Sequence, residues 1–458
     1  MSVGRAPTFR SPAGTIALTS AIAGLASLLV LSEPWLPDPN SWLVWANQIA
    51  HGHGIDFSVG PSWKPLPVIW SIPGSWASSQ AAALAWIWLV RSCATATLLL
   101  AAVLVTPRFG RAAGLLSAVF PLAIGPWNEA WLGGSAEPVL TAAVLAAALA
   151  WRAERREAAI MLVAIGGLVR PEAWLLAIAL LALEARHQRR RAIILAAAVV
   201  GFEALAWFIA PWALGGSLLQ ASDRAQTISI AAEHGLIDAG LSQLPAVAAL
   251  LVPAGAWAVV RRRDRVLIAI AIGSVAYALT VALAGIAGYS GIPRYYVPAA
   301  VGLAVLAGPG AAELIRLIPS PVLRPAAALL VAAAIAPGLA ESARQARDTV
   351  TLADTAIDNA DRGVELFGSI GGPSAFEGCK PFGANGFEVR ILARRLELAL
   401  PDVSASVTAP TVVLDDSNLP KATLRVDGKG ARPKVLATDP PNWTVILHAP
   451  GGRCPAGR

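Results

Sequence analysis

Long apolar runs, separated by short polar segments, make up the chain as far as about residue 340. An apolar run of about 20 residues crosses the hydrocarbon core of a bilayer as one helix, and several runs here are rich in Ala and Leu. We predict about eleven spans, near residues 13–31, 85–105, 112–127, 136–151, 157–169, 173–185, 192–211, 243–260, 266–285, 296–315 and 322–340. The pattern therefore predicts an all-α polytopic membrane protein.

Composition agrees with this class, because 56% of the 458 residues are hydrophobic and only 14% are charged. Basic residues occupy every second segment between the predicted spans, at Arg5 and Arg10, Arg108 and Arg111, Arg152 to Arg156, Arg186 to Arg191, Arg261 to Arg265, and Arg316 with Arg324. Such loops face the cytoplasm. We expect a multi-pass protein of the inner (plasma) membrane with a cytoplasmic N-terminus and an extracytoplasmic C-terminus.

The net charge of +7 comes from the membrane part, since the tail beyond residue 340 has 14 basic and 14 acidic residues. The basic balance therefore reflects topology, and no nucleic-acid partner is expected beside the lipid bilayer. We predict two domains, a transmembrane domain over 1–340 and a small extracytoplasmic α/β domain over 341–458. In the tail, 385–398 is typical of a helix, and 411–414 and 443–447 are typical of strands.

Cysteine placement is consistent with an extracytoplasmic tail. Cys379 and Cys454 lie in the tail, where a disulfide can form, whereas Cys93 lies within a predicted span. A bridge between the two tail cysteines and a pair of free thiols are both open. No Cys/His spacing indicates a zinc site, and a divalent cation bound by other ligands is also left open.

The loop after the first span has six of the chain's 16 tryptophans, interleaved with polar residues. An interfacial aromatic belt explains many of the tryptophans. It does not explain Asp38, His53 and Lys64, which lie among Trp42 and Trp63. Aromatic faces beside hydrogen-bonding groups suit a sugar, so we predict a sugar-binding site here, with Asp38 as its carboxylate.

Two further polar segments are expected on the same outer face. Asn128 and Glu129 precede the fourth span, and Glu137 begins it, where the helix dipole also stabilises an anion as a simple cap. The motif Arg170-Pro171-Glu172 interrupts one apolar stretch whose two flanks are both cytoplasmic, which predicts two short helices turning at this motif. Charges at such depth are costly unless they line a wet cavity.

A third segment, Pro293-Arg294-Tyr295, contains the sole Arg of its loop beside aromatic residues. An arginine at a helix entrance suits a phosphate through bidentate hydrogen bonds, although a snorkelling anchor is the alternative. We predict phosphate binding by Arg294, Tyr295 and Arg170, with Arg91 as a weaker candidate. Asn128 and Glu172 are predicted to contact sugar or acceptor.

The order of these motifs resembles the GT-C superfamily of integral-membrane glycosyltransferases. The matching features are Asp38 after the first span, a long aromatic loop ending in Lys64-Pro65-Leu66-Pro67, Ser135-Ala136-Glu137-Pro138, Arg170-Pro171-Glu172, and Pro293-Arg294-Tyr295. The resemblance covers roughly residues 10 to 340. It implies a polyprenyl-phosphate-linked sugar donor and a catalytic role for Asp38. Many members have two adjacent acidic residues where this chain has Asp38-Pro39-Asn40, a departure that leaves open both a metal site and whether Glu33 or Asp56 assists.

The expected function is inverting transfer of a hexosyl or pentosyl group, as in mannosyl- and arabinosyltransferases, to a cell-wall glycan, glycolipid or protein. Asp38 is the predicted base, with Glu137 or Glu129 as the other catalytic carboxylates. A transporter or flippase of a lipid-linked glycan is an alternative, as is a structural subunit of the cell envelope. The absence of an obvious internal repeat and the gathering of polar residues on one face favour the enzyme.

Overall fold

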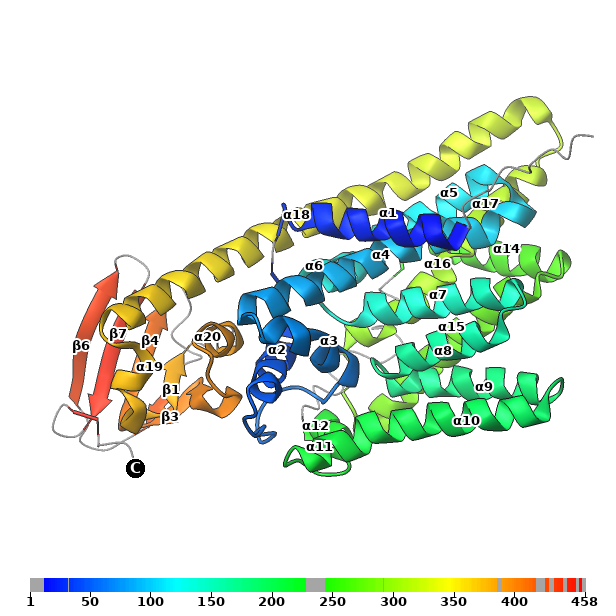
Figure 1. Cartoon of the computed structure of the whole chain (residues 1–458). Helices are drawn as coiled ribbons and strands as arrows, with labels where there is room; N and C mark the ends of the chain where they lie inside the picture. The colour runs from blue at the N-terminus through cyan, green and yellow to red at the C-terminus, as the bar shows by residue number, and fades with distance from the viewer. Residues whose placement is uncertain are drawn as a thin grey trace, which may run out of the picture.

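The computed structural model describes residues 12–31, 33–227, 244–290, 292–384, 389–416, 425–427, 432–439, 443–449 and 453–454. It consists of a helical bundle with a small sheet at one end (Figure 1). The helices of the first half that matter below are α1 (Pro12–Ser27), α2 (Pro37–Ala50), α3 (Pro65–Ser75), α4 (Ser79–Phe109), α5 (Arg111–Val119), η1 (Phe120–Ala123), α6 (Gly125–Gly133), α7 (Glu137–Arg152), α8 (Arg156–Gly167), η2 (Pro171–Ala173), α9 (Trp174–Ala185) and α10 (Arg189–Ala204).

The second half continues the bundle and adds one exceptionally long helix. Its helices are η3 (Leu205–Ile209), α11 (Ala210–Ala213), α12 (Gln220–Thr227), α14 (Ala248–Arg261), α15 (Arg265–Ile286), η4 (Pro293–Tyr296), α16 (Val297–Ala304), α17 (Ala307–Arg316), η5 (Pro321–Leu323) and α18 (Arg324–Ser369). A helix lies in each of the eleven segments predicted to span. The two short helices predicted around Arg170 are also present, as α8 and α9.

Length and apolar composition qualify five described helical segments to cross a membrane. They are Ser79–Phe109, Arg189–Ala213, Arg265–Ile286, Pro293–Arg316 and Pro321–Ser369. The pair α6 and α7, bent by 107°, makes a sixth if it is counted as one span. The predicted number of eleven is not reproduced by this measure, because helices such as α8 and α9 have only 12 residues each.

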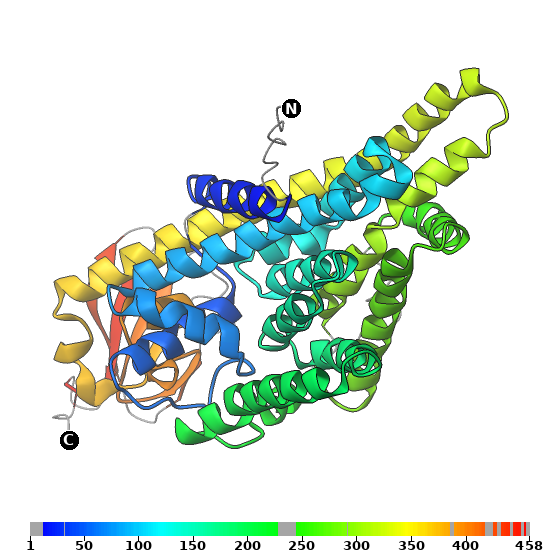
Figure 2. The same cartoon turned by 45° about the vertical axis from the view of Figure 1, so that its right-hand side comes forward.

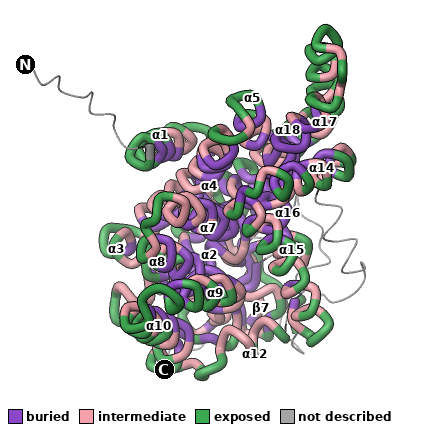
Figure 3. The backbone as a smooth tube through the Cα atoms, turned by 90° about the vertical axis from the view of Figure 1, so that its right-hand side faces the viewer, coloured by how far each residue is buried: buried purple, intermediate pink, exposed green. Residues whose placement is uncertain are grey.

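The outer surface of the bundle is apolar. Figure 3 shows many exposed residues along α1 and α10, at the periphery of the bundle. Large hydrophobic side chains are exposed there and on α15 and α18, among them Leu18, Ile22, Ile193, Ile194, Ile272, Leu279, Leu329 and Leu330. Contiguous apolar surface of this kind is unfavourable in water and favourable against lipid chains. The fold is therefore that of an integral membrane protein.

Ion pairs hold the basic loops together at one end of the bundle. Asp264 accepts from both Arg108 and Arg152 at 2.8 Å, and Glu313 accepts from Arg261 at 3.0 Å and from Arg316 at 2.8 Å. Arg152 ends α7, whereas Glu137 begins it. The arginine-rich end and the end that bears Glu137 are therefore opposite ends of the same helices.

Helix α18 joins the bundle to the C-terminal unit without a break. It packs against α6 and η1 in the bundle and against β4, β6 and β7 beyond it, and Figure 2 shows its course from one part to the other. The domain boundary predicted at residue 340 lies inside this helix, because the apolar character of its sequence ends about there while its helical geometry continues to Ser369.

The C-terminal unit is α/β, as predicted. It contains α19 (Gly372–Ala375), η6 (Glu377–Cys379), α20 (Val389–Arg395), η7 (Leu400–Asp402) and the strands β1 (Phe382–Ala384), β2 (Val403–Ser404), β3 (Ser406–Thr408), β4 (Thr411–Asp416), β5 (Arg425–Asp427), β6 (Arg432–Asp439) and β7 (Trp443–Ala449). The five-stranded sheet has the order β2-β1-β4-β7-β6. The predicted helix and both predicted strands are confirmed, although residues 385–388 of that helix lie outside the described residues.

The end of α18 covers this sheet through a small-residue contact. A Cβ added to Gly363 would lie 3.0 Å from the Trp443 ring, so glycine lets the indole approach the helix backbone. Phe367 packs beside it, with its ring centroid 5.3 Å from that of Phe382. Cys379 and Cys454 form a disulfide, which confirms the bridge that the sequence left open against free thiols.

Candidate active site

Helix α2 lies between the membrane helices and the C-terminal unit. Pro37 starts it with a preset backbone angle and no amide hydrogen to leave unpaired. Its 3.6-residue period divides it into two faces. Asn40 and Val44 face the C-terminal unit, whereas Asp38, Trp42 and Trp45 face the bundle, where Trp42 packs edge-on against Trp86 of α4.

Asp38 is in the first turn of α2, where the helix dipole favours a carboxylate. It forms an ion pair with Arg294, which η4 presents from the other half of the chain. About a quarter of each side chain is exposed, 24% for Asp38 and 25% for Arg294. The pair is thus open enough for a ligand to reach it.

Arg170 lies deeper in the same site, at the turn between α8 and η2. Its Nη2 donates to Glu137 Oε1 at 2.6 Å, and its Nη1 lies 3.7 Å from Glu172 Oε1. Both guanidinium groups lie over the Tyr295 ring, with Cζ of Arg170 3.6 Å and Cζ of Arg294 5.7 Å from the ring centroid. Tyr295 therefore lies between the two arginines and offsets part of their repulsion through its π face.

Lys64 brings a third cation. It precedes α3, it is only 6% exposed, and its Nζ lies 4.8 Å from the centroid of the Trp42 ring. Burial, and after it the positive charge of Arg170, lowers the pKa of the Lys64 ammonium to about 7. The charges of Glu137, Arg294 and Asp38 also act on it, so all of these groups belong to one electrostatic site.

Several atoms of this site are buried and have no hydrogen-bond partner within the described part of the chain. They are Arg170 Nε, Arg294 Nε, Glu137 Oε2, Glu172 Oε2 and the Tyr277 hydroxyl. Each unpaired buried polar group costs about 1–3 kcal/mol, so a cluster of them is typical of a site that a ligand completes. The unpaired donors on two arginines suit an anion.

Sequence reasoning missed Tyr277, which lies on α15, packs in the same cluster as Tyr295 and Tyr296, and has a buried hydroxyl without a partner among the described residues. The available signal was a lone tyrosine within an otherwise apolar span. A polar group at that depth is expensive unless it faces the interior of the bundle.

Other predicted residues are used elsewhere. Arg91 donates to the carbonyl oxygens of Ser27 at 2.9 Å and Leu132 at 3.2 Å, and also to that of Leu31. It therefore ties the chain around α1 and α6 to α4. Asn128 donates to Leu122 O and Ser342 Oγ and accepts from Trp131, which fixes α6 against α18.

Three more candidates have distinct positions. Glu129 is exposed on α6, and no ion pair among the described residues includes it. His53 is exposed and lines a separate cavity behind α2. Trp63 is buried, donates to Ala206 O at 3.0 Å and packs against Trp45 and Phe57, so it forms part of the wall below Lys64.

The two extra carboxylates considered from the sequence do not face Arg294. Asp56 caps its own loop by accepting from the Ser58 amide at 2.7 Å. No group of three or more His, Cys, Asp or Glu side chains within the described ranges could hold a metal ion. The divalent cation left open by the sequence thus gains no ligand cluster there.

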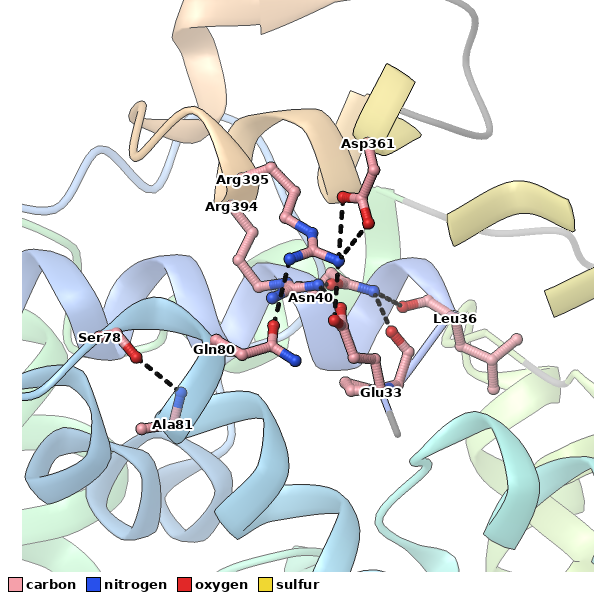
Figure 4. A network of polar contacts seen from close by, with 10 residues as sticks. Glu33, Leu36, Asn40, Ser78, Gln80, Ala81, Asp361, Arg394 and Arg395 are labelled. Carbon is pink, nitrogen blue, oxygen red and sulfur yellow. Dashed lines mark hydrogen bonds and ion pairs between the residues drawn. The ribbon is translucent and has the colours of Figure 1, made fainter. Parts of the chain in front are cut away.

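Glu33 instead clamps the C-terminal unit onto α2 (Figure 4). It accepts from Arg394 and, at 2.7 Å, from Arg395, both on α20. Arg394 Nε donates to Asn40 Oδ1 at 2.7 Å, and Arg395 reaches Asp361 of α18 at 3.0 Å. Asn40 also donates to the carbonyl oxygens of Pro34 and Leu36, so this network holds the first turn of α2, which includes Asp38.

The fold of this chain is similar to that of a solved membrane protein, and this agrees with the fold that the sequence resemblance implied. The structure of ArnT from Cupriavidus metallidurans bound to undecaprenyl phosphate superimposes with a TM-score of 0.58, covering 94% of this chain and 98% of that one at 13% identity. The same protein in the apo state gives a TM-score of 0.55 over 95% of this chain and 98% of that one, also at 13% identity. ArnT is a GT-C glycosyltransferase. No protein-family model and no curated protein sequence matches the chain.

Proposed function

We propose that this protein is an inverting glycosyltransferase that moves a sugar from a polyprenyl-phosphate donor to a cell-envelope acceptor on the extracytoplasmic face. The observation that carries the proposal is the Asp38–Arg294 ion pair beside Arg170 and Tyr295. A base and a set of phosphate-binding cations are then available in one partly open site. The undecaprenyl phosphate bound to ArnT, which shares the fold, supports a lipid-phosphate donor.

In the proposed reaction the acceptor hydroxyl gives its proton to Asp38 as its oxygen attacks the anomeric carbon. The bond between that carbon and the phosphate oxygen breaks, and the lipid phosphate leaves with the additional negative charge. Arg294 and Arg170 offset this charge. Direct displacement inverts the anomeric configuration, so a product that retained it would contradict the mechanism.

Arg294 has a double role in this scheme. In the unliganded protein it pairs with Asp38, whereas a bound phosphate competes for the same guanidinium. Donor binding would therefore release an Asp38 oxygen for the acceptor hydroxyl. Glu137 acts as a positioning residue, because its 2.6 Å hydrogen bond holds Arg170 toward Tyr295. Lys64 adds positive charge, while Trp42 shapes the sugar pocket.

Two observations support the orientation that we propose for the plasma membrane. The arginine-rich ion pairs lie at the end of the bundle opposite Glu137, as expected of a cytoplasmic face. The Cys379–Cys454 disulfide belongs to the C-terminal unit, and disulfides persist in oxidising compartments. The orientation can be tested with a membrane-impermeant thiol reagent added to intact cells. The cysteine of His51→Cys, on the proposed outer side, should react, and that of Arg189→Cys, on the proposed cytoplasmic side, should not. The reverse pattern would invert the topology.

The function is tested by incubating the purified protein with radiolabelled polyprenyl-phosphate hexoses and pentoses and a cell-envelope extract as acceptor. Transfer in detergent, without a second compartment, supports the enzyme over a transporter. Donor movement across proteoliposomes without any transfer would instead favour the flippase alternative. Neither activity, in a protein that still binds a cell-envelope partner, would favour the structural subunit.

A further inference from the structure

A cavity of about 410 Å³ lies between part of α2 and the C-terminal unit, on the side of α2 that faces away from Asp38. Asn47 and Gln48 of α2 line it, as do Arg394 of α20 and Glu397 just beyond α20. Asn47 comes nine residues after Asp38, or about 14 Å along the helix axis at 1.5 Å per residue. The cavity is thus a second site, distinct from the cluster around Arg294.

Three residues that line the cavity have buried hydrogen-bonding atoms without a partner among the described residues, and these atoms include both donors and acceptors. Arg394 has only 1% of its side chain exposed, and its Nε and Nη2 are bonded to Asn40 and Glu33. Its Nη1 has no partner among the described residues, and neither have the buried acceptors Asn47 Oδ1 and Gln48 Oε1. A ligand that completes this site must both accept and donate hydrogen bonds. A hydroxyl group does both.

The charges of the cavity disfavour an anion. Lys380 is paired with Asp402 at 3.3 Å, and the charge of Arg394 is paired with Glu33, which leaves Glu397 as an extra negative charge. Anions also lack the donors that the two amide oxygens require. Val44 and Leu398 supply apolar surface at the wall of the cavity for C–H groups.

We infer that this cavity binds an uncharged, polyhydroxylated glycan segment of the acceptor, at a distance from the position where the sugar is transferred. That the glycan belongs to the acceptor rests on the proposed function, whereas binding of the glycan requires no turnover. A bound glycan would contact Arg394, which is also bonded to Glu33 and to Asn40 of α2. Acceptors that already have a neutral glycan would bind more tightly than acceptors without one, so the site would select them.

The test is retention of the purified full-length protein on an array of neutral and anionic bacterial cell-envelope oligosaccharides, in a detergent without a sugar headgroup. We expect neutral glycans to be retained. Replacing Asn47 and Gln48 by Leu and Met, which keeps their volume, should weaken retention at least about tenfold in Kd, the value of one net hydrogen bond. Gln345→Met, which alters an exposed amide on α18, is the matched control and should bind normally.

Asp38→Asn should bind the same glycans as the unaltered protein, because its side chain lies on the opposite face of α2. Retention that survives in Asp38→Asn while transfer is absent in every assay would leave the glycan site intact and count only against the proposed function. Retention of anionic glycans alone, no retention of any glycan, or equal retention by the Asn47/Gln48 variant would overturn the inference. Thermal unfolding of each variant separates lost binding from lost folding.

Discussion

Asp38 and Arg294 form an ion pair although 256 positions separate them in the sequence. The pair connects the first turn of α2 to η4, and Tyr295, next to Arg294, extends it to Arg170. A carboxylate and its guanidinium partner that both remain partly exposed can exchange partners when an anion enters. The following predictions concern that exchange and the groups that support it.

Asp38→Asn should lower sugar transfer by about a hundredfold to ten-thousandfold, the usual cost of losing a proton acceptor. The amide keeps the shape of the side chain but cannot take up the proton. Asp56→Asn is the control, since Asp56 is exposed in the following loop, where it accepts a hydrogen bond from the Ser58 amide. Initial rates at saturating donor compare the two variants. Full activity of Asp38→Asn would require another base, for which Glu137 and Glu129 are the candidates from the sequence.

Arg294→Gln should weaken donor binding about tenfold to hundredfold, because a hydrogen bond to a charged group contributes about 1.5–3 kcal/mol. Arg294→Lys should recover part of this loss through its charge but not the bidentate geometry. Equilibrium binding of a radiolabelled donor measures the effect without turnover. Arg344→Gln, at an exposed pair on α18, should bind as the unaltered protein does. Equal affinity of Arg294→Gln and this control would move the phosphate site to Arg170.

The two carboxylates at the mouth of the fourth predicted span should differ sharply in their effect on stability. Glu137 is buried against Arg170, whereas Glu129 is exposed. Removing one member of a buried ion pair costs about 3–5 kcal/mol, and Glu172 at 3.7 Å moderates the loss for Arg170. Glu137→Gln should therefore lower the free energy of unfolding by an amount near the smaller end of that range, about 3 kcal/mol.

Chemical unfolding in micelles measures this difference, with Glu129→Gln as the matched control, expected within about 0.5 kcal/mol of the unaltered protein. Combining Glu137→Leu with Arg170→Met should recover stability, because the pair is then replaced by apolar side chains of similar size. Equal destabilisation by Glu129→Gln and Glu137→Gln would argue against the buried pair.

Donor binding should depend on pH through Lys64, whose pKa is lowered to about 7 by burial and by Arg170. Below that pH the folded protein holds the ammonium form, and above it the neutral amine. A phosphodiester donor keeps one negative charge over this range and favours the ammonium. Donor affinity should accordingly fall as the pH rises above about 7, since binding then requires uptake of a proton.

Lys64→Arg keeps its charge and should make donor affinity nearly independent of pH between 6 and about 9, which binding isotherms at each pH measure. Stability should change in the opposite direction. The unfolded chain still binds the proton between pH 7 and the ordinary lysine pKa, so the free energy of unfolding rises with pH over that window. Lys64→Met should remove this rise. If donor affinity in Lys64→Arg and the free energy of unfolding in Lys64→Met still change with pH as in the unaltered protein, the pH dependence belongs to another group.

The membrane character and the polar motifs between the helices were predictable because each depends on local sequence. Apolar length gave the helices, and the order of Asp38, Glu137, Arg170 and Arg294 gave most of the cluster. The contacts between these segments were not predictable, because they require the packing of helices far apart in the chain. Arg91 and Asn128 illustrate this difference. Their polar side chains satisfy backbone or packing partners inside the bundle, and no sequence pattern distinguishes that use from ligand binding.

The clamp at Glu33 could not be predicted either, since its partners Arg394 and Arg395 lie more than 360 residues later. It allows a graded test, because Arg395 pairs with both Glu33, 3% exposed, and Asp361, 45% exposed. Breaking the buried side with Glu33→Gln should cost about 3–5 kcal/mol, whereas Asp361→Asn should cost at most about 1 kcal/mol.

Glu33→Gln should also lower kcat more than it raises KM for the donor, because the displaced α2 carries Asp38 while Arg294 and Arg170 stay in place. Unfolding and steady-state kinetics on both variants measure these effects. If Asp361→Asn proves as damaging as Glu33→Gln, the position of α2 depends on α18 and not on the buried contact.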